Sequence, residues 1–517
     1  MRLLAALIAL TLPALTLPAL PQPPRDAPGT AGPPPAAPDE PAPPKERKAP
    51  EKAAASLKST TTGKVTLAGK EVAYEAETNT LVLLNEKDEP LARVFYVFYR
   101  RTGSEGTDGR PLLFCFNGGP GSSSAWLHLG GLGPRRVVMA ADGTASPPPP
   151  FALEPNPDSL LDAADLVFVD PVGTGFSRAE DGKDQRQFLG FNEDVGYLSD
   201  FIRRFVAEHG RWRSPKYLLG ESYGVFRVAG LADQLQDRFG MYLNGVVLMS
   251  GLLDFRTLAA TGGNDLPYVC YLPAFAAVAR FHGRLPDSPG ITQVMSNARA
   301  LAFGDYAAAL LAGDRLPADQ RATLAARLEK ATSLPAALWL EADLRLDPSV
   351  FRQWLLKGSG EVVGRFDARV KAPVRDRLSN FAHGDPSFDV AWGPFSTLIN
   401  DYLGRELKAS GPQVYEVLGG GGGPWNYGAT NAFARADDRL VSALVRNPRL
   451  KVLVQCGTFD LATPPDSILH TIGQLDLPAP LRANLSVEFY EGGHMFYLDR
   501  AASAKMRADL LRFIAPT

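Results

Sequence analysis

Short apolar runs recur along this chain and are separated by segments with a helical pattern. The runs cover residues 112–116, 165–169, 217–219, 246–249, 451–455 and 486–490. Continuous apolar runs of this length are typical of strands buried on both faces of a parallel sheet. The helical pattern covers residues 191–209, 225–239, 429–446 and 502–513. This alternation predicts an α/β fold with a mostly parallel central sheet flanked by helices.

A different pattern precedes the first buried run. Between residues 64 and 101, apolar and polar positions alternate, and the polar run 86–89 separates the apolar runs 81–84 and 94–99. Alternation with polar breaks is typical of antiparallel strands. We therefore expect antiparallel strands at the start of the sheet.

The region 255–424 interrupts the succession of strands and helices. It holds Ala- and Leu-rich runs such as 298–312 and 318–329, which favour helix, and it ends near the glycine run 419–423. We interpret it as a mainly helical cap insertion between two parts of the core, residues 59–254 and 425–517. An independent domain is the alternative interpretation.

The start of the chain has the layout of a secretory signal. A positive second residue is followed by an apolar run at 3–20, which Pro13 and Pro18 interrupt. This predicts a signal peptide at 1–20 rather than a membrane anchor, the alternative. Residues 21–58 are rich in Pro and Ala and predict a disordered spacer. We expect a secreted or periplasmic protein with no integral membrane span in the mature chain.

Charge and cysteine content narrow the function classes further. The net charge of −2 gives no electrostatic footprint for a nucleic-acid partner. The three cysteines, Cys115, Cys270 and Cys456, form no Cys-x-x-Cys pair, and the first and third lie in predicted strands. The chain contains no His-Glu-x-x-His motif, so a metallohydrolase is poorly supported.

A Gly-x-Ser-x-Gly motif stands between a predicted strand and a predicted helix. The motif is Gly220-Glu221-Ser222-Tyr223-Gly224, directly after the run 217–219. A strand, this motif and a helix are the context that a nucleophile elbow needs. The glycines remove side chains that would clash in so tight a turn. Ser222 is therefore the candidate nucleophile.

A base and an acid are expected after the two last strands, in the order Ser, Asp, His. Asp460 follows the run 451–455, and His494 follows the run 486–490. His494 would take the proton from the serine, and a buried Asp460 would hold the imidazole in one tautomer. Asp466 is the rival acid. His128, close to a glycine-rich turn, is a further candidate for substrate contact.

An oxyanion hole requires two backbone N–H groups. One is expected from Tyr223, the residue after the nucleophile, and the other from the loop after an early strand. The loop Asn117-Gly118-Gly119-Pro120-Gly121 follows the run 112–116. An ordinary Gly-Pro turn is the alternative interpretation of this loop.

These motifs together resemble the serine carboxypeptidases of the α/β-hydrolase fold. The residues that carry the resemblance are 116–123, 170–177, 220–224, 457–460 and 493–495. The blocks Asn117-Gly118-Gly119-Pro120-Gly121 and Val172-Gly173-Thr174-Gly175-Phe176-Ser177 are much more specific than Gly-x-Ser-x-Gly. The chain looks most like a bacterial branch of that family.

The resemblance implies a role for each matching residue. Ser222, Asp460 and His494 would be the catalytic triad, and Gly119 and Tyr223 would donate to the oxyanion. Asn117, Gly118 and Glu221 would hold the C-terminal carboxylate of a peptide. Glu221 can do so only when protonated, because two carboxylates repel each other. A buried acid that braces the elbow is the alternative reading of Glu221.

The sequence also departs from the family pattern. A second acid normally pairs with the elbow glutamate, and at the corresponding position this chain has Gly131. Arg135 and Arg136 lie near enough in sequence to be a cationic substitute. The disulfide framework of the family is largely absent, and Ser122 stands where a cysteine is common.

The leading expectation is a secreted serine carboxypeptidase that acts on peptides through an acyl-enzyme, without cofactor or metal. An esterase or acyltransferase with the same triad is the alternative, and the glycine at position 131 favours it. A non-catalytic binding protein is a third possibility. The sequence leaves the oligomeric state and the side-chain preference open.

Overall fold

The computed structural model describes residues 56–103, 109–419 and 424–515. The expected signal peptide and nearly all of the expected spacer lie outside the described residues, and so does most of the glycine run that ends the cap insertion. Among the helices of the described ranges, none is both long enough and apolar enough to cross a membrane.

One large sheet forms the centre of the molecule. Its strands follow the order β1-β2-β3-β7-β4-β9-β10-β13-β14, and a short β8 pairs with β3. The strands are β1 (Ser59–Leu67), β2 (Lys70–Leu84), β3 (Pro90–Arg101), β4 (Leu112–Phe116), β7 (Asp165–Val169), β8 (Arg178–Ala179), β9 (Lys216–Glu221), β10 (Gly245–Met249), β13 (Lys451–Gly457) and β14 (Leu485–Tyr490). The first three are antiparallel, and all strands from β7 to β14 along this order are parallel. Both sequence predictions for the sheet are confirmed.

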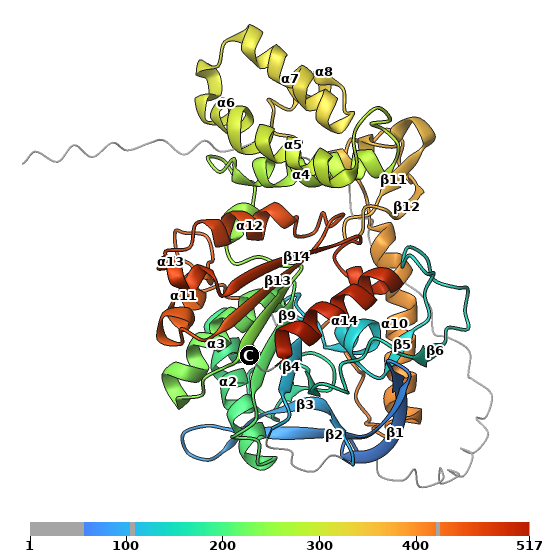
Figure 1. Ribbon diagram of the computed structural model, residues 1–517, viewed down its shortest axis with the longest axis vertical. Helices are drawn as coiled ribbons and strands as arrows, with labels where there is room; N and C mark the ends of the chain where they lie inside the picture. Colours follow the sequence, from blue (N-terminus) through green and yellow to red (C-terminus); the bar gives the residue numbers. More distant parts are fainter. Residues whose placement is uncertain (1–55, 104–108, 420–423, 516–517) are drawn as a thin grey trace, which may run out of the picture. The chain divides into compact units, whose positions relative to one another are not determined.

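Helices cover both faces of the sheet (Figure 1). Side chains from α2 (Phe191–Glu208), α3 (Tyr223–Phe239) and α11 (Asp437–Arg446) join one hydrophobic cluster, and those from α10 (Pro386–Arg405) and α14 (Arg500–Ile514) join the other. The strands feed both clusters because alternate side chains point to opposite faces. In β4, for example, Phe114 lies in the first cluster and Cys115 in the second.

A third hydrophobic cluster lies in the region predicted to be a cap. It is built mainly from α4 (Leu266–Phe281), α5 (Ile291–Leu301), α6 (Ala307–Ala312), α7 (Ala318–Thr332), α8 (Ala336–Glu341) and α9 (Pro348–Trp354), which we call the cap helices. Phe459 and Leu461, from the loop after β13, also belong to it, so this loop links cap and core. A parallel sheet with antiparallel leading strands, helices on both faces and a helical excursion before the last two strands is an α/β-hydrolase fold.

Several smaller elements differ from the sequence predictions. The cap region contains a hairpin of β11 (Glu361–Val363) and β12 (Lys371–Pro373), strands too short to leave a pattern. We call residues 361–373 the cap hairpin. The helix expected from residue 429 begins only at Asp437, and the run 298–312 is broken around Gly304. The remaining short elements are α1 (Ala125–Leu127), β5 (Arg135–Val137), β6 (Leu153–Pro155), α12 (Pro465–Gly473) and α13 (Ala479–Arg482).

Candidate active site

Ser222 occupies a sharp turn between β9 and α3. Its backbone has φ 61° and ψ −125°, a conformation that non-glycine residues rarely adopt. A Cβ at Gly220 would lie 2.0 Å from the carbonyl oxygen of Gly224, and one at Gly224 would lie 2.6 Å from that of Phe116. The sequence folds into this turn because both flanking positions are glycine. Such strained turns persist where the surrounding structure fixes them, typically at functional sites.

His494 and Asp460 form a buried pair at the carboxyl ends of β13 and β14. Nδ1 of His494 lies 2.7 Å from Oδ2 of Asp460. The Asp460 carboxylate also accepts the N–H groups of Ala462 and Thr463 and the Thr463 hydroxyl, at 2.7–2.9 Å. These donors fix the carboxylate, so Nδ1–H of the ring donates to it. Nε2 is then the nitrogen left to accept a proton.

Opposing effects act on the charge of His494. Burial disfavours the charged ring, but the neighbouring Asp460 carboxylate outweighs burial and raises the pKa of His494 above its ordinary value. The Glu221 carboxylate adds to this effect. Protonation of Glu221 therefore favours the neutral form of His494, the form that can act as a base.

Ser222 and His494 line one cavity of about 200 Å³. Its other lining residues are Asn117, Gly118, Gly119, Ser122, Trp126, Glu221, Leu258, Arg365, Phe366, Phe388, Leu418, Ala462, Thr463 and Met495. The cavity thus combines aromatic and apolar side chains with a few convergent polar groups, as ligand sites do. The cap hairpin supplies Arg365 and Phe366, which sequence reasoning did not find because no motif marks them.

The loop after β4 brings a backbone N–H beside the nucleophile. Within the described residues, the Gly119 N–H has no acceptor, and Tyr223 is the first residue of α3, where N–H groups have no partner inside the helix. A Cβ at Gly118 would lie 2.5 Å from the Tyr223 nitrogen, so only glycine permits this approach. The N–H groups of Gly119 and Tyr223 are thus available for an oxyanion.

A buried aspartate fixes the position of this loop. Oδ1 of Asp170 accepts the backbone N–H and the hydroxyl of Ser124, at 2.8 and 2.7 Å. Burial raises the pKa of Asp170 to about 6. The hydroxyl of Ser177 in turn donates to the Asp170 carbonyl oxygen at 2.6 Å. Asp170 thus joins the segment after the glycine loop to the block 172–177.

Glu221 is buried at the end of β9 and receives hydrogen bonds from two side chains. Nδ2 of Asn117 donates to Oε2, and the Tyr497 hydroxyl lies 3.0 Å from both carboxylate oxygens. The Asn117 amide is oriented for this contact because the N–H of Leu127 donates to its oxygen. Burial nevertheless raises the pKa of Glu221 to about 7. Glu221 can therefore gain or lose a proton near neutrality.

Tyr497 occupies the space next to Gly131. A Cβ at Gly131 would lie 3.2 Å from the Tyr497 ring and 3.3 Å from the Met506 methyl group. Any side chain at Gly131 would therefore crowd both groups. The phenol of Tyr497, and not a second acid, lies beside Glu221. Sequence reasoning missed Tyr497, although it stands three residues after His494.

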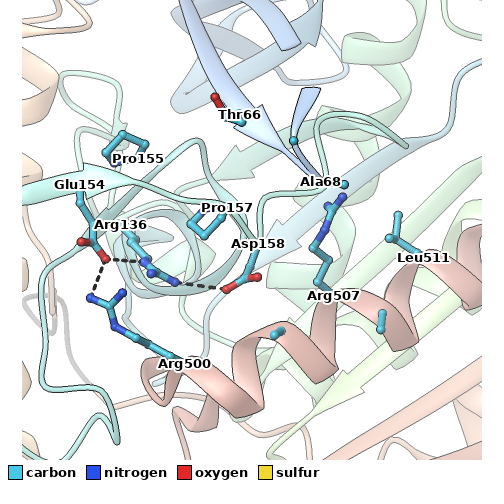
Figure 2. Close-up of a pocket in the computed structure, with 13 residues that line it drawn as sticks. Thr66, Ala68, Arg136, Glu154, Pro155, Pro157, Asp158, Arg500, Arg507 and Leu511 are labelled. Carbon is cyan, nitrogen blue, oxygen red and sulfur yellow. Dashed lines mark hydrogen bonds and ion pairs between the residues drawn. The ribbon is translucent and has the colours of Figure 1, made fainter. Parts of the chain in front are cut away.

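The structure contradicts the expectation that Arg135 or Arg136 assists Glu221. Arg135 pairs with Glu406 at 3.0 Å. Arg136 pairs with Glu154 at 2.8 Å and with Asp158 at 3.2 Å, in a different cavity that Arg500 and Arg507 also line (Figure 2). Neither arginine lines the cavity at Ser222. Proximity in sequence misled here because β5 carries both side chains toward other carboxylates.

Two rival residues also lie elsewhere. Asp466 forms an ion pair with Arg299 of α5 and does not contact His494. His128 stacks on Phe168, with ring centroids 4.4 Å apart, and its Nε2 lies 2.7 Å from the Tyr99 hydroxyl. Burial lowers the pKa of His128 to about 3. The expectation that His128 contacts substrate is wrong, because its ring is enclosed in the core.

The three cysteines and Ser122 lie in buried positions. All three cysteines are free and buried, as expected for Cys115 and Cys456 in strands. Ser122, where the family commonly has a cysteine, accepts a hydrogen bond from the Trp126 indole at 2.9 Å. This contact holds Trp126 in the wall of the cavity.

Comparison with known proteins points to one family. The family model described as serine carboxypeptidase matches residues 81–268. This stretch of the chain is therefore similar to that family. It includes the glycine loop, the block 170–177 and the serine elbow, but not the positions of Asp460 and His494.

Relatives in plants match about a third of the chain. A serine carboxypeptidase-like protein of rice is 29% identical over 174 residues, which are 32% of this chain and 37% of the relative. Serine carboxypeptidase-like 48 of Arabidopsis thaliana is 31% identical over 31% of this chain and 30% of the relative. The chain thus aligns with about a third of the length of these curated relatives.

A solved structure aligns over more of the chain. It is a prohormone-processing carboxypeptidase from Saccharomyces cerevisiae, 18% identical, with a TM-score of 0.48 over 85% of this chain and 91% of that one.

Proposed function

We propose that this protein is a serine carboxypeptidase that releases C-terminal amino acids from peptides. The observation that supports this best is the common cavity of Ser222, His494 and Glu221, in which a nucleophile and its base lie beside a buried carboxyl group. The family match over residues 81–268 supports the same class.

The proposed reaction begins with attack of the Ser222 hydroxyl on the carbonyl carbon of the last peptide bond. His494 takes the hydroxyl proton at Nε2, and Asp460 stabilises the imidazolium. The N–H groups of Gly119 and Tyr223 stabilise the oxyanion. His494 then protonates the departing amino acid, and an acyl-enzyme remains. Water attacks this ester in the second half of the cycle, with His494 again as the base.

Recognition of the substrate C-terminus is assigned to Asn117, Gly118 and Glu221. A protonated Glu221 donates its hydrogen to the substrate carboxylate, whereas an ionised one repels it. Since the pKa of Glu221 is about 7, recognition weakens as pH rises through neutrality. The proposed enzyme therefore prefers acidic conditions for free-carboxylate peptides.

An esterase or acyltransferase with the same triad is the second candidate. One observation favours it: the side-chain partners of Glu221, Asn117 and Tyr497, are donors and thus stabilise the ionised carboxylate. A substrate without a carboxylate would avoid the repulsion. The same Ser222 acyl-enzyme would form, but another nucleophile could accept the acyl group.

We further propose a secreted protein with a signal peptide at 1–20, a spacer at 21–58, core segments at 59–254 and 425–517, and a cap insertion at 255–424. Within this insertion α10 packs with the core cluster rather than with the cap helices. Placement in a bacterial branch belongs to this proposal, whereas the relatives reported above are plant proteins.

A comparison of two dipeptides tests the proposal. Both are blocked at the N-terminus, and one carries a free C-terminal carboxylate while the other is amidated. We expect cleavage of the free acid by the purified protein, stronger at pH 5 than at pH 8, and no cleavage by the Ser222→Ala variant. Cleavage of esters with no cleavage of the free acid would instead support the esterase or acyltransferase.

A further inference from the structure

Arg365 is an arginine at the candidate active site without a carboxylate partner. It lies on the cap hairpin, lines the cavity that holds Ser222 and His494, and its side chain is exposed. Within the described ranges, no Asp or Glu oxygen lies within 4.0 Å of its guanidinium. The guanidinium lies over the ring of Phe366, with its carbon 5.2 Å from the ring centroid.

The backbone of Arg365 is held from two sides. Its N–H donates to Asp385 at 2.8 Å, and its carbonyl oxygen accepts the N–H of Leu461 at 3.0 Å. The next residue, Phe366, accepts the backbone N–H of His494. The root of the Arg365 side chain is therefore fixed relative to both the cap and the catalytic histidine, and only the side chain is free to adjust.

Arg365 also stands where two cavities meet. A second cavity of about 340 Å³ shares Arg365 and Leu258 with the cavity at Ser222. Tyr268, Tyr271 and Arg352 line this second cavity, and Asp347 contributes a carboxylate that caps its own helix. A substrate that extends from Ser222 toward the cap helices would pass the guanidinium.

We propose that Arg365 binds a carboxylate of the substrate at this junction, either the C-terminal carboxylate or an acidic side chain next to the cleaved bond. A guanidinium grips a carboxylate with two parallel hydrogen bonds. It would supply the cation that Arg135 and Arg136 do not. The positive charge acts at the site already, because Arg365 is among the groups that lower the pKa of His494.

This inference rests on the proposed function for its assay. Three N-blocked dipeptides separate the possible sources of the carboxylate: a neutral free acid, its amide, and an amide whose last residue is glutamate. Two of these dipeptides carry a carboxylate: the neutral free acid and the glutamyl amide. We expect Arg365→Gln to lower kcat/KM about 10- to 100-fold more for one of these two than for the neutral amide, mainly through KM. Arg365→Lys should recover part of the loss.

A matched control is Arg375→Gln, which removes an exposed arginine just past the cap hairpin that lines neither cavity. A selective loss on the free acid would assign Arg365 to the C-terminus, and a selective loss on the glutamyl amide would assign it to a side chain. Equal kinetics for Arg365→Gln and Arg375→Gln, or an equal loss on all three substrates, would overturn the inference.

Binding measured without catalysis separates this inference from the proposed function. Calorimetry with Ser222→Ala protein gives the Kd of each intact dipeptide, with and without Arg365→Gln. If binding depends on Arg365 but the protein with Ser222 intact cleaves no peptide, the proposed function is refuted and the inference is retained. Cleavage with Arg365-independent binding would refute only the inference. Failure of every dipeptide to bind would also overturn it.

Discussion

Substitution of Glu221 by Gln tests how the buried glutamate recognises the C-terminal carboxylate of the substrate. Gln has nearly the same shape and can donate an N–H at every pH, whereas Glu221 can donate only when protonated. The pKa of Glu221 is about 7 because the carboxyl group is buried, despite the lowering effects of His494, Tyr497 and Asn117. Wild-type recognition of a free carboxylate should therefore depend on pH, and recognition by the variant should not.

The size of the effect follows from this pKa. A group with a pKa of about 7 is about 90% protonated at pH 6 and about 10% protonated at pH 8. If only the protonated form binds the substrate carboxylate, kcat/KM for a free acid falls about tenfold over this interval, an effect of about 1.4 kcal/mol. The titration of His494 also changes the rate, but it affects free acids and amides alike.

The informative quantity is therefore a ratio. We would measure kcat/KM for an N-blocked dipeptide as the free acid and as the amide, from pH 5 to pH 9, and divide one by the other. The ratio should fall about tenfold from pH 6 to pH 8 in the wild type and change less than about twofold in Glu221→Gln. A wild-type ratio that is flat, or a variant ratio that falls as steeply, would show that Glu221 does not bind the substrate carboxylate in its protonated form.

Further predictions concern the same site. Tyr497→Phe removes a donor that lowers the pKa of Glu221, so the fall in the ratio should move about one pH unit upward, and an unchanged midpoint would contradict this. Gly131→Asp should destabilise the fold by about 2 kcal/mol or more in denaturant unfolding, since a Cβ there already lies 3.2 Å from the Tyr497 ring; unchanged stability would show that the site has room. Asp460→Asn should lower kcat about 10³- to 10⁴-fold with KM nearly unchanged, because Nδ1–H of His494 loses its acceptor. The pKa of Glu221 is raised from 4.5 to about 7, so the folded state favours the protonated carboxyl group. The stabilisation from Glu221 is fully present below pH 4.5 and is lost as pH rises through 7. Glu221→Gln should consequently gain about 3 kcal/mol at pH 8 relative to pH 4, measured by urea unfolding against the wild type.

The fold was predictable because its signals are local. The inner parallel strands are buried, mostly apolar runs, and each elbow or loop glycine is required by an immediate neighbour in space. Ser222, Asp460 and His494 could be found in the same way, since each lies in the turn that follows a strand of the sheet. The carboxyl ends of parallel strands lie at the same edge of a sheet. The meeting of these three residues was therefore predictable.

The partners of Glu221 and the cavity wall were not predictable, because they depend on packing between distant segments. Tyr497 reaches Glu221 through the turn after β14, and the place it fills is open only because residue 131 is glycine. Arg365 reaches the site from a hairpin with three-residue strands. Arg135 and Arg136 are adjacent to the glycine loop in sequence, yet β5 directs them to other carboxylates.

Stepwise shortening of a longer peptide would show directly whether this protein is a carboxypeptidase. A neutral peptide with a free C-terminus would be incubated at pH 5 with the purified protein or with Ser222→Ala. The masses of the products would be measured by mass spectrometry. We expect successive loss of single residues from the C-terminus with the wild type and an intact peptide with the variant. Internal fragments, or the same shortening by Ser222→Ala, would contradict it.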